Sequence, residues 1–383
     1  MSSPFLSWPK RRIAPALCLA LVMSLGASRA RAWGADETPA FRGVTVGPIE
    51  SSQQRGRGYG TKYSAELLDE LVRLGANWIS ITPFGRIWSL KSSEILMDFE
   101  TPYAENRRAV QTVIEQAHAR GLRVLVIPHL WVETGGWRGE IDPGSDQGWR
   151  AYQTSYRSFI LSWAKDAGDW GADAFSIGVE CKSWSGRFGE FWTGLINEIR
   201  GVFPGLLTYS SNWDEVEEVL FWDQLDLIGV NAFYPLAEHN NATYEEYLSG
   251  ARDALQSVRD LAQTLRMPVL FVEVGYTTRS NAAVEPWLWP DDMHEVVVDE
   301  REQARAISAI LEAALPNPWL VGFFIWRYYA NIDDVSQEAI WGFSPHGKLA
   351  ERVLKEIFAV RWGADPQERP WQRSRLAPIE DLY

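Results

Sequence analysis

Short apolar runs alternate with amphipathic helical patterns along nearly the whole chain, and this alternation strongly limits the possible fold. Eight runs have the character of buried strands, and they begin at Arg42, Asn77, Leu122, Ala174, Leu206, Leu225, Val269 and Val321. Strands that alternate with helices at this spacing build a parallel sheet, and eight such units close a barrel. Because no Gly-rich phosphate-binding turn follows a strand, we predict a single-domain α/β fold, the (β/α)8 TIM barrel, rather than a doubly wound sheet.

The helical patterns between these runs support the same architecture. Residues 64–74 and 108–117 show helical periodicity and are followed by Gly75 and Gly121, and Gly is a common residue just after a helix. Later helices are expected at residues 152–170, 188–202, 244–265, 302–314 and 348–358, with a short fifth helix near residues 215–221.

The two ends of the chain differ from the region between them. Lys10-Arg11-Arg12 precede an apolar stretch from Ile13 to Gly26, which is followed by Ala30-Arg31-Ala32. This is the layout of a secretory signal peptide, and the apolar stretch is shorter than the ~20 residues of a membrane span. We therefore predict a signal peptide over residues 1–32, a barrel domain over 33–361 and a C-terminal tail over 362–383. The mature protein would be secreted or periplasmic.

Charge and cysteine content limit the partners. Loss of residues 1–32 removes five basic residues and no acidic one, which changes the net charge from −13 to −18. Such a chain is a poor partner for nucleic acid or anionic membranes. Five scattered histidines and the absence of paired-cysteine spacing predict no metal site, and no cofactor is expected. Cys181 is interpreted as a small buried residue rather than a thiol nucleophile, and the protein is expected to be a monomer.

Two glutamates stand where an apolar run meets a loop. Glu180 ends the fourth run, Phe175-Ser-Ile-Gly-Val, and Glu273 ends the seventh, Val269-Leu-Phe-Val. The carboxyl ends of barrel strands carry the chemistry of this fold. A pair of carboxyl groups ~5–5.5 Å apart supports glycoside hydrolysis with retention, one as acid/base and one as nucleophile. We expect Tyr234, near the end of the sixth run, to donate a hydrogen bond that holds Glu273 ionised.

Aromatic and polar residues follow the same strand ends. The chain has 20 Trp, and the flat faces of pyranose rings stack on indole, so a polysaccharide or oligosaccharide substrate is expected. His129 ends the third run, and Arg86, Asn212 and Asn231 are candidates for holding substrate hydroxyls or the carboxylates. The candidate stacking residues are Trp131, Trp137, Trp213, Trp289 and Trp326.

Several segments in this order resemble glycoside hydrolase family 113: Pro128-His-Leu-Trp131, Trp137-Arg-Gly-Glu-Ile141, Phe175-Ser-Ile-Gly-Val-Glu180, Leu207-Thr-Tyr-Ser-Ser-Asn-Trp213, Asp226-Leu-Ile-Gly-Val-Asn-Ala-Phe-Tyr-Pro-Leu236 and Val269-Leu-Phe-Val-Glu-Val-Gly-Tyr276. That family belongs to a clan of retaining (β/α)8 glycosidases, and its characterised members are β-mannanases. The resemblance implies that Glu180 is the acid/base and Glu273 the nucleophile of an endo-β-1,4-mannanase. It also implies that Trp326 lies under the sugar ring at the cleavage point.

The residues around Glu180 depart from the pattern of that clan. Val179 stands where many members have Asn, Cys181 follows Glu180, and Lys182 adds a cation nearby. Three alternatives therefore stay open. The chain could act on another β-glycan or exopolysaccharide, transfer sugars instead of hydrolysing them, or be a catalytically weak barrel that binds a polysaccharide.

Overall fold

The structure is a computed structural model, and it describes residues 41–47, 56–98, 102–288, 296–331, 338 and 341–359. All of them lie in one compact unit, Ala40–Tyr383. The predicted signal peptide over residues 1–32 and the predicted tail over 362–383 lie outside the described residues. The limits of the domain therefore stay a prediction.

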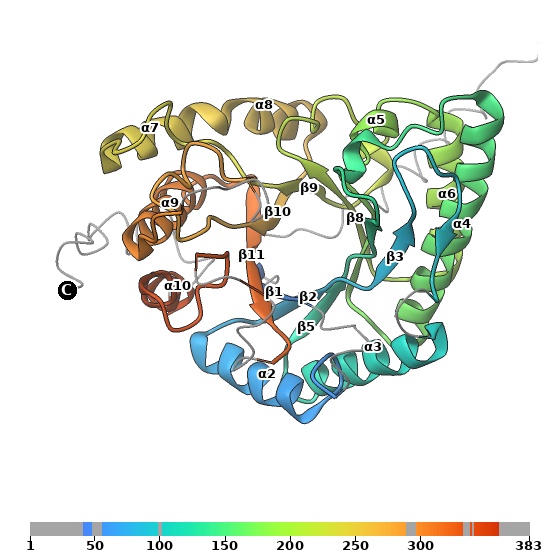
Figure 1. Cartoon of the computed structure of the whole chain (residues 1–383), viewed down its shortest axis with the longest axis horizontal. Helices are drawn as coiled ribbons and strands as arrows, with labels where there is room; N and C mark the ends of the chain where they lie inside the picture. Colours follow the sequence, from blue (N-terminus) through green and yellow to red (C-terminus); the bar gives the residue numbers. More distant parts are fainter. Residues whose placement is uncertain are drawn as a thin grey trace, which may run out of the picture. The chain divides into compact units, whose positions relative to one another are not determined.

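Eight parallel strands close into a barrel, which confirms the predicted fold (Figure 1). Their order around the barrel is β1-β11-β10-β9-β8-β7-β5-β2. Each strand coincides with one of the eight apolar runs, and the bounds are β1 Phe41–Gly47, β2 Trp78–Ile81, β5 Arg123–Val126, β7 Ala174–Val179, β8 Leu206–Asn212, β9 Ile228–Asn231, β10 Val269–Val274 and β11 Leu320–Tyr329.

A second, smaller sheet was not predicted. It has the order β4-β3-β6, with β3 Phe84–Ile87, β4 Ile95–Leu96 and β6 His129–Val132. Strand β3 follows the end of β2, and β6 follows the end of β5, so the sheet extends the carboxyl end of the barrel. It carries three candidate site residues, Arg86, His129 and Trp131.

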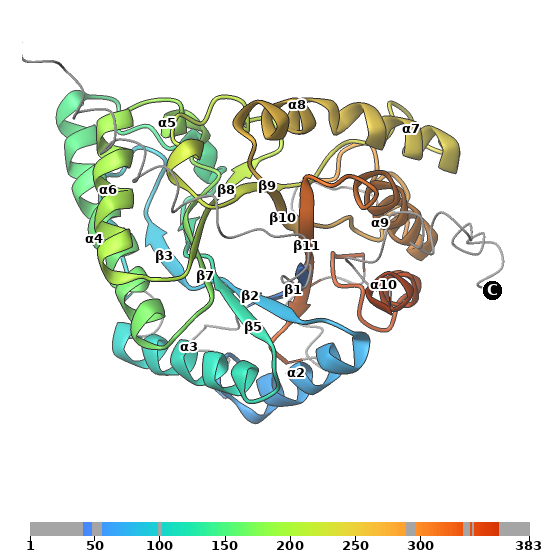
Figure 2. The ribbon, with the colours of Figure 1, turned by 180° about the vertical axis from the view of Figure 1, so that it is seen from behind.

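Helices surround the barrel in both views (Figures 1 and 2). The first helix, α2 Lys62–Leu74, shows how the sequence determines where a helix begins and ends. The Thr61 hydroxyl oxygen accepts a hydrogen bond from the Ser64 N–H, and Gly75 adopts φ 100° at the other end. The bounds are α2 Lys62–Leu74, α3 Tyr103–His118, α4 Asp146–Asp169, α5 Lys182–Ser185, α6 Gly189–Val202, α7 Tyr244–Ala254, α8 Gln256–Leu265, α9 Glu300–Ala314 and α10 Leu349–Ala359.

Two helix predictions need correction. The helix expected near residues 215–221 is wrong, because this segment forms turns that lead to the 3-10 helix η3, Trp222–Gln224. Its buried Glu215 side chain accepts the Asn212 N–H at 3.0 Å, and this local bond favours a turn over a helix. The single helix expected over residues 244–265 is divided at Leu255 into α7 and α8.

The barrel interior contains hydroxyl groups as well as apolar side chains. The Ser80 hydroxyl donates to the Thr45 hydroxyl at 2.8 Å, and the hydroxyls of Ser176 and Ser210 are 2.9 Å apart. All four residues are buried. These pairs satisfy polar groups that would otherwise be costly to bury. In the part of the chain that the structure describes, no helix is both long and apolar enough to cross a membrane.

Candidate active site

Glu180 follows directly after β7 and has an unusual backbone conformation. Its φ is 48°, in the left-handed region that residues other than Gly seldom adopt. Its N–H donates to the Ser210 carbonyl oxygen at 2.8 Å, and its side chain is buried. Strained conformations of this kind cost on the order of 1–3 kcal/mol and occur at functional sites.

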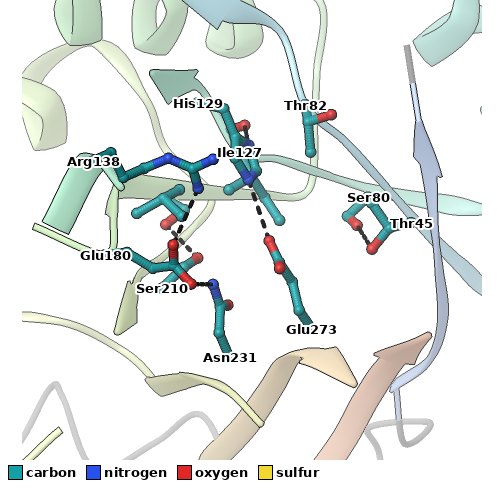
Figure 3. Close-up of polar contacts among 12 residues, drawn as sticks. Thr45, Ser80, Thr82, Ile127, His129, Arg138, Glu180, Ser210, Asn231 and Glu273 are labelled. Atoms are coloured by element: carbon teal, nitrogen blue, oxygen red, sulfur yellow. Dashed lines mark hydrogen bonds and ion pairs between the residues drawn. The ribbon is translucent and has the colours of Figure 1, made fainter. Parts of the chain in front are cut away.

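Three N–H donors from different segments hold the Glu180 carboxyl group. The Trp137 indole donates to Oε2 at 2.9 Å, and Arg138 Nη1 donates to the same oxygen at 3.3 Å. Asn231, the last residue of β9, donates through Nδ2 to Oε1 at 3.1 Å. Figure 3 shows Arg138 and Asn231 reaching Glu180 from different directions. The carboxyl group is therefore fixed in position.

Arg138 is the contact that sequence reasoning missed. It begins the short helix η2, Arg138–Glu140, and its Nε also donates to the Leu130 carbonyl oxygen at 2.9 Å. The Trp137-Arg-Gly-Glu segment was the signal that could have found it. The expected neighbour, Lys182, instead pairs with Asp214, so Arg138 is the cation that contacts Glu180.

Glu273 is buried in β10, and its partner is His129. The His129 Nε2 lies 3.2 Å from Glu273 Oε1, and His129 Nδ1 lies 2.9 Å from the Ile127 carbonyl oxygen. Because a carbonyl oxygen only accepts, Nδ1 carries a hydrogen. The contact between Nε2 and Oε1 then needs one further proton, which the two residues share.

The surroundings favour the carboxyl group as the holder of that proton. Burial, followed by the charge of Arg138, lowers the pKa of His129 to about 3. Burial and the nearby Glu180 carboxylate raise the pKa of Glu273 above its ordinary value, although Arg138 and Arg327 oppose this. These shifts favour a protonated Glu273 beside a neutral His129, whereas the sequence led us to expect an ionised Glu273.

The predicted hydrogen bond from Tyr234 to Glu273 is wrong. Tyr234 is buried, its ring centroid lies 6.5 Å from that of Phe271, and its hydroxyl has no partner among the described residues. Strand β9 ends at Asn231, so the alternation of side chains no longer governs the residues that follow it. Asn231 rather than Tyr234 occupies the position next to the carboxyl groups.

Cys181 and Asn212 each have a local partner. Burial and the charge of Glu215 raise the pKa of the Cys181 thiol to about 12, so the thiol stays protonated. Cys181 is therefore the buried residue that we predicted. Asn212 donates through Nδ2 to Asp214 Oδ1 at 2.7 Å.

The candidate aromatic residues divide between the centre and its surroundings. The Trp326 ring lies 5.9 Å from the ring of His129, the residue that contacts Glu273. Trp213 stacks on the partly exposed Trp287, with ring centroids 5.9 Å apart. Trp131 is 43% exposed on β6.

Arg86 lies within the small sheet. Its guanidinium is 5.6 Å from the Trp131 ring, and its Nη1 forms an ion pair with Glu133 at 3.1 Å. Trp289 lies outside the described residues. The structure thus brings Glu180, Glu273, His129, Asn231, Trp137 and Trp326 together, while the described contacts of Arg86, Asn212, Trp131 and Trp213 are with residues other than the two glutamates.

Chemically, the centre offers two carboxyl groups in unlike surroundings. Glu180 has three N–H partners, whereas Glu273 shares a proton with an imidazole. In Figure 3 both side chains extend into the same region. Among the described residues, no group of three or more His, Cys, Asp and Glu side chains could hold a metal ion. Such a pair can exchange protons with a substrate and can attack it.

Stability should fall as the pH rises through about 7. Burial raises the pKa of Glu215 to about 7, so its folded-state pKa lies above its unfolded-state pKa. Such a group stabilises the fold fully below the unfolded-state pKa and loses this contribution as the pH rises through the folded-state pKa. One pKa unit corresponds to about 1.4 kcal/mol, so the loss of stability is on the order of 3 kcal/mol.

We expect a lower thermal unfolding midpoint at pH 8 than at pH 5. Glu215→Gln should reduce that difference, and an unchanged difference would contradict the assignment.

The sequence and the fold are similar to those of known glycoside hydrolases. The model of Glycoside Hydrolase Family 113 matches residues 50–348. Curated protein sequences give no match. A GH113 β-mannanase from Alicyclobacillus acidocaldarius, solved in complex with ManMIm, is 27% identical, with 85% of this chain and 99% of that chain covered and a TM-score of 0.72. A second structure, of a GH113 β-1,4-mannanase, is 23% identical over 84% of this chain and 99% of that chain, with a TM-score of 0.72, and it shows the same fold.

Proposed function

Since this chain belongs to glycoside hydrolase family 113, and is therefore a glycoside hydrolase with a carbohydrate substrate, we propose that it cleaves β-1,4-mannan or a similar β-hexose polysaccharide. Cleavage would be internal and would retain the anomeric configuration, with Glu180 as acid/base and Glu273 as nucleophile. The observation that carries the proposal is the placement of two buried carboxyl groups at the ends of the fourth and seventh barrel strands, extending into the same region (Figure 3). The 27% identical β-mannanase supports the choice of substrate.

The first chemical step needs opposite protonation states at the two glutamates. Before this step Glu180 takes up a proton from solvent. The Glu273 carboxylate then attacks the anomeric carbon, while Glu180 gives that proton to the departing glycosidic oxygen. The bond to that oxygen breaks as the bond to Glu273 forms. In the second step Glu180 takes a proton from water, the water oxygen attacks the same carbon, and Glu273 is released.

His129 supplies the route by which Glu273 becomes ionised. The shared proton can move from Glu273 Oε1 to His129 Nε2, which leaves a carboxylate beside an imidazolium. The Ile127 carbonyl oxygen keeps the imidazole in the orientation that this transfer needs. The charges of Arg138 and Arg327 partly oppose the rise in the pKa of Glu273 that burial and Glu180 cause.

The donors around Glu180 orient it for both steps. Trp137 and Arg138 hold Oε2, and Asn231 holds Oε1. In the second step Glu180 is ionised, and these N–H groups stabilise the carboxylate that acts as a base. Trp326 would stack under the sugar ring at the cleavage point, and its ring, 5.9 Å from that of His129, supports this role.

A panel of polysaccharides tests the proposal. Purified residues 33–383 are incubated with mannan, cellulose and xylan, and the products are measured as reducing ends, by mass and by anomeric configuration. We expect mannan oligosaccharides whose newly formed reducing end is initially the β anomer. Initial formation of the α anomer would contradict retention, and preferential release from cellulose or xylan would contradict the substrate. Retardation in a gel that contains mannan, without product, would instead indicate a binding barrel.

Export is part of the proposal. It is supported by the order of basic residues, apolar stretch and Ala30-Arg31-Ala32 in residues 1–32. The protein isolated from its native cells should have the mass of a chain that begins near Trp33, and a full-length mass would contradict export.

A further inference from the structure

A chain of buried hydrogen bonds connects the segment of Glu180 to a third glutamate. The Cys181 N–H donates to the Tyr209 hydroxyl oxygen at 2.6 Å, and the Tyr209 hydroxyl donates to Glu215 Oε1. The other oxygen of Glu215, Oε2, accepts the Asn212 N–H at 3.0 Å. Tyr209 and Glu215 have no solvent exposure. None of these groups is used in the chemical steps described above.

The direction of this chain is fixed by its first member. A backbone amide can only donate, so the Tyr209 oxygen accepts from Cys181, and the Tyr209 hydrogen is free for Glu215. Both carboxyl oxygens of Glu215 therefore act as acceptors, Oε1 for the Tyr209 hydroxyl and Oε2 for the Asn212 N–H. Its burial raises its pKa, which is a cost that the two donors offset in part.

The chain ends at the peptide bond that determines the backbone of Glu180. The Glu180 N–H donates to the Ser210 carbonyl oxygen at 2.8 Å, and the next N–H, of Cys181, donates to Tyr209. Both acceptors belong to β8. The two peptide groups on either side of the Glu180 Cα atom are therefore tied to one strand, and the left-handed φ of 48° lies between them.

The segment that follows is held as well. The Cys181 carbonyl oxygen accepts the Trp184 N–H at 2.9 Å and the Ser185 N–H at 2.8 Å, at the start of α5. A residue in a sparsely populated backbone conformation keeps it only where its surroundings determine it from several sides. Here Tyr209, supported by Glu215, accepts the hydrogen bond that ties this segment to β8.

We propose that Tyr209 and Glu215 are positioning residues for Glu180. They keep its backbone in the left-handed conformation from which its carboxyl group reaches Trp137, Arg138 and Asn231. This inference rests on the proposed role of Glu180 as acid/base. Both residues are fully buried, so they act through Glu180, and their effect would appear in the steps in which Glu180 gives or takes a proton.

The test is the dependence of the rate on the leaving group. Aryl β-mannosides or aryl β-manno-oligosaccharides are used, with leaving groups that range from 2,4-dinitrophenol to phenol. A good leaving group departs without a proton, whereas a poor one needs the acid. Because displacement of a catalytic group by about 1 Å can cost about 100-fold, Tyr209→Phe should lower kcat/KM by roughly 10- to 100-fold with phenol. With 2,4-dinitrophenol the loss should be less than about 3-fold, since the acid is not needed there.

A matched control separates positioning from stability. Tyr247 and Glu302 form another buried pair, in which the Tyr247 hydroxyl donates to the Glu302 carboxylate at 2.7 Å and the Ala283 N–H donates to it at 3.1 Å. Tyr247→Phe removes the same chemical group from α7. It should lower the unfolding midpoint to a similar degree and change kcat/KM by the same factor for every leaving group.

Glu215→Gln provides a second variant in case Tyr209→Phe does not fold. The two donors bond to different oxygens of Glu215, and Gln replaces one of these oxygens with an NH2 group. One donor therefore loses its acceptor, and a smaller change of the same kind is expected. An effect that is equal for all leaving groups in both variants would overturn the positioning role. The Glu180→Ala variant is measured in parallel: if it too shows no dependence on the leaving group, the proposed function fails, and if it alone shows the dependence, only the present inference fails.

Discussion

Replacing Glu273 with alanine is expected to lower kcat/KM on the polysaccharide by about 10⁴-fold or more. The substitution removes the atom that forms the covalent bond to the sugar, and removal of a nucleophile typically costs this much or more. The side chain is buried, and its described partner is His129, so the loss should arise from chemistry rather than from a surface contact. Release of reducing ends under initial-rate conditions measures the effect.

Azide distinguishes the loss of a nucleophile from general damage. In Glu273→Ala the space left by the carboxyl group admits a small anion, which attacks the anomeric carbon from the same face that Glu273 used. With an aryl β-glycoside the product should therefore be the α-glycosyl azide. The variant could unfold at the wild-type temperature and yet show neither activity nor this product. Glu273 would then be needed for activity, but the experiment would not support its role as the nucleophile. If Glu273→Ala retains wild-type activity, the assignment is wrong.

Replacing Glu180 with alanine should produce a loss that depends on the substrate. On the polysaccharide, kcat should fall by about 10²- to 10⁴-fold, the usual contribution of a general acid or base. With a 2,4-dinitrophenyl glycoside the first step no longer needs a proton, so the phenol should appear in a burst equal to the enzyme concentration. The glycosyl-enzyme then accumulates, because no base activates water. Stopped-flow absorbance measures both phases.

The product with azide should be the opposite of that from Glu273→Ala. In Glu180→Ala, azide displaces Glu273 from the far face of the sugar and yields the β-glycosyl azide. Exchange of the two products between the variants would show that the roles are reversed. A suitable control is Glu198→Gln, since Glu198 pairs with Arg157 on the exposed surface and should keep wild-type rates and products.

Local patterns were sufficient for the barrel. Each of the eight apolar runs forms a barrel strand, because burial on both faces requires continuous apolar residues, which are visible in a single segment. The small sheet of β3, β4 and β6 was missed for the same reason. Its strands are two to four residues long and depend on pairing between distant segments, such as Phe84 with His129. The helix expected near residues 215–221 does not form, because the buried Glu215 side chain accepts a hydrogen bond from the nearby Asn212 N–H and so favours a turn.

Within the site, positions at strand ends were predictable and partners were not. Glu180, Glu273, His129 and Asn231 lie at or near the ends of apolar runs, and the structure has them near one another (Figure 3). Tyr234 was misplaced because β9 ends three residues before it. Lys182 was expected beside Glu180 because it is near in sequence, yet its side chain pairs with Asp214, and Arg138 takes that place.

The sequence by itself determined the number of strand-helix units, the strands that carry the two glutamates and the family resemblance. These properties depend on residue type and spacing along one segment. The tertiary structure alone decided which groups hold each carboxyl group and in which direction their pKa values shift. The pair His129 and Glu273 is separated by 144 residues, and Asn231 and Glu180 by 51. The pKa of a buried group depends on its distance to such partners and on its exclusion from water, and neither quantity exists until the barrel closes.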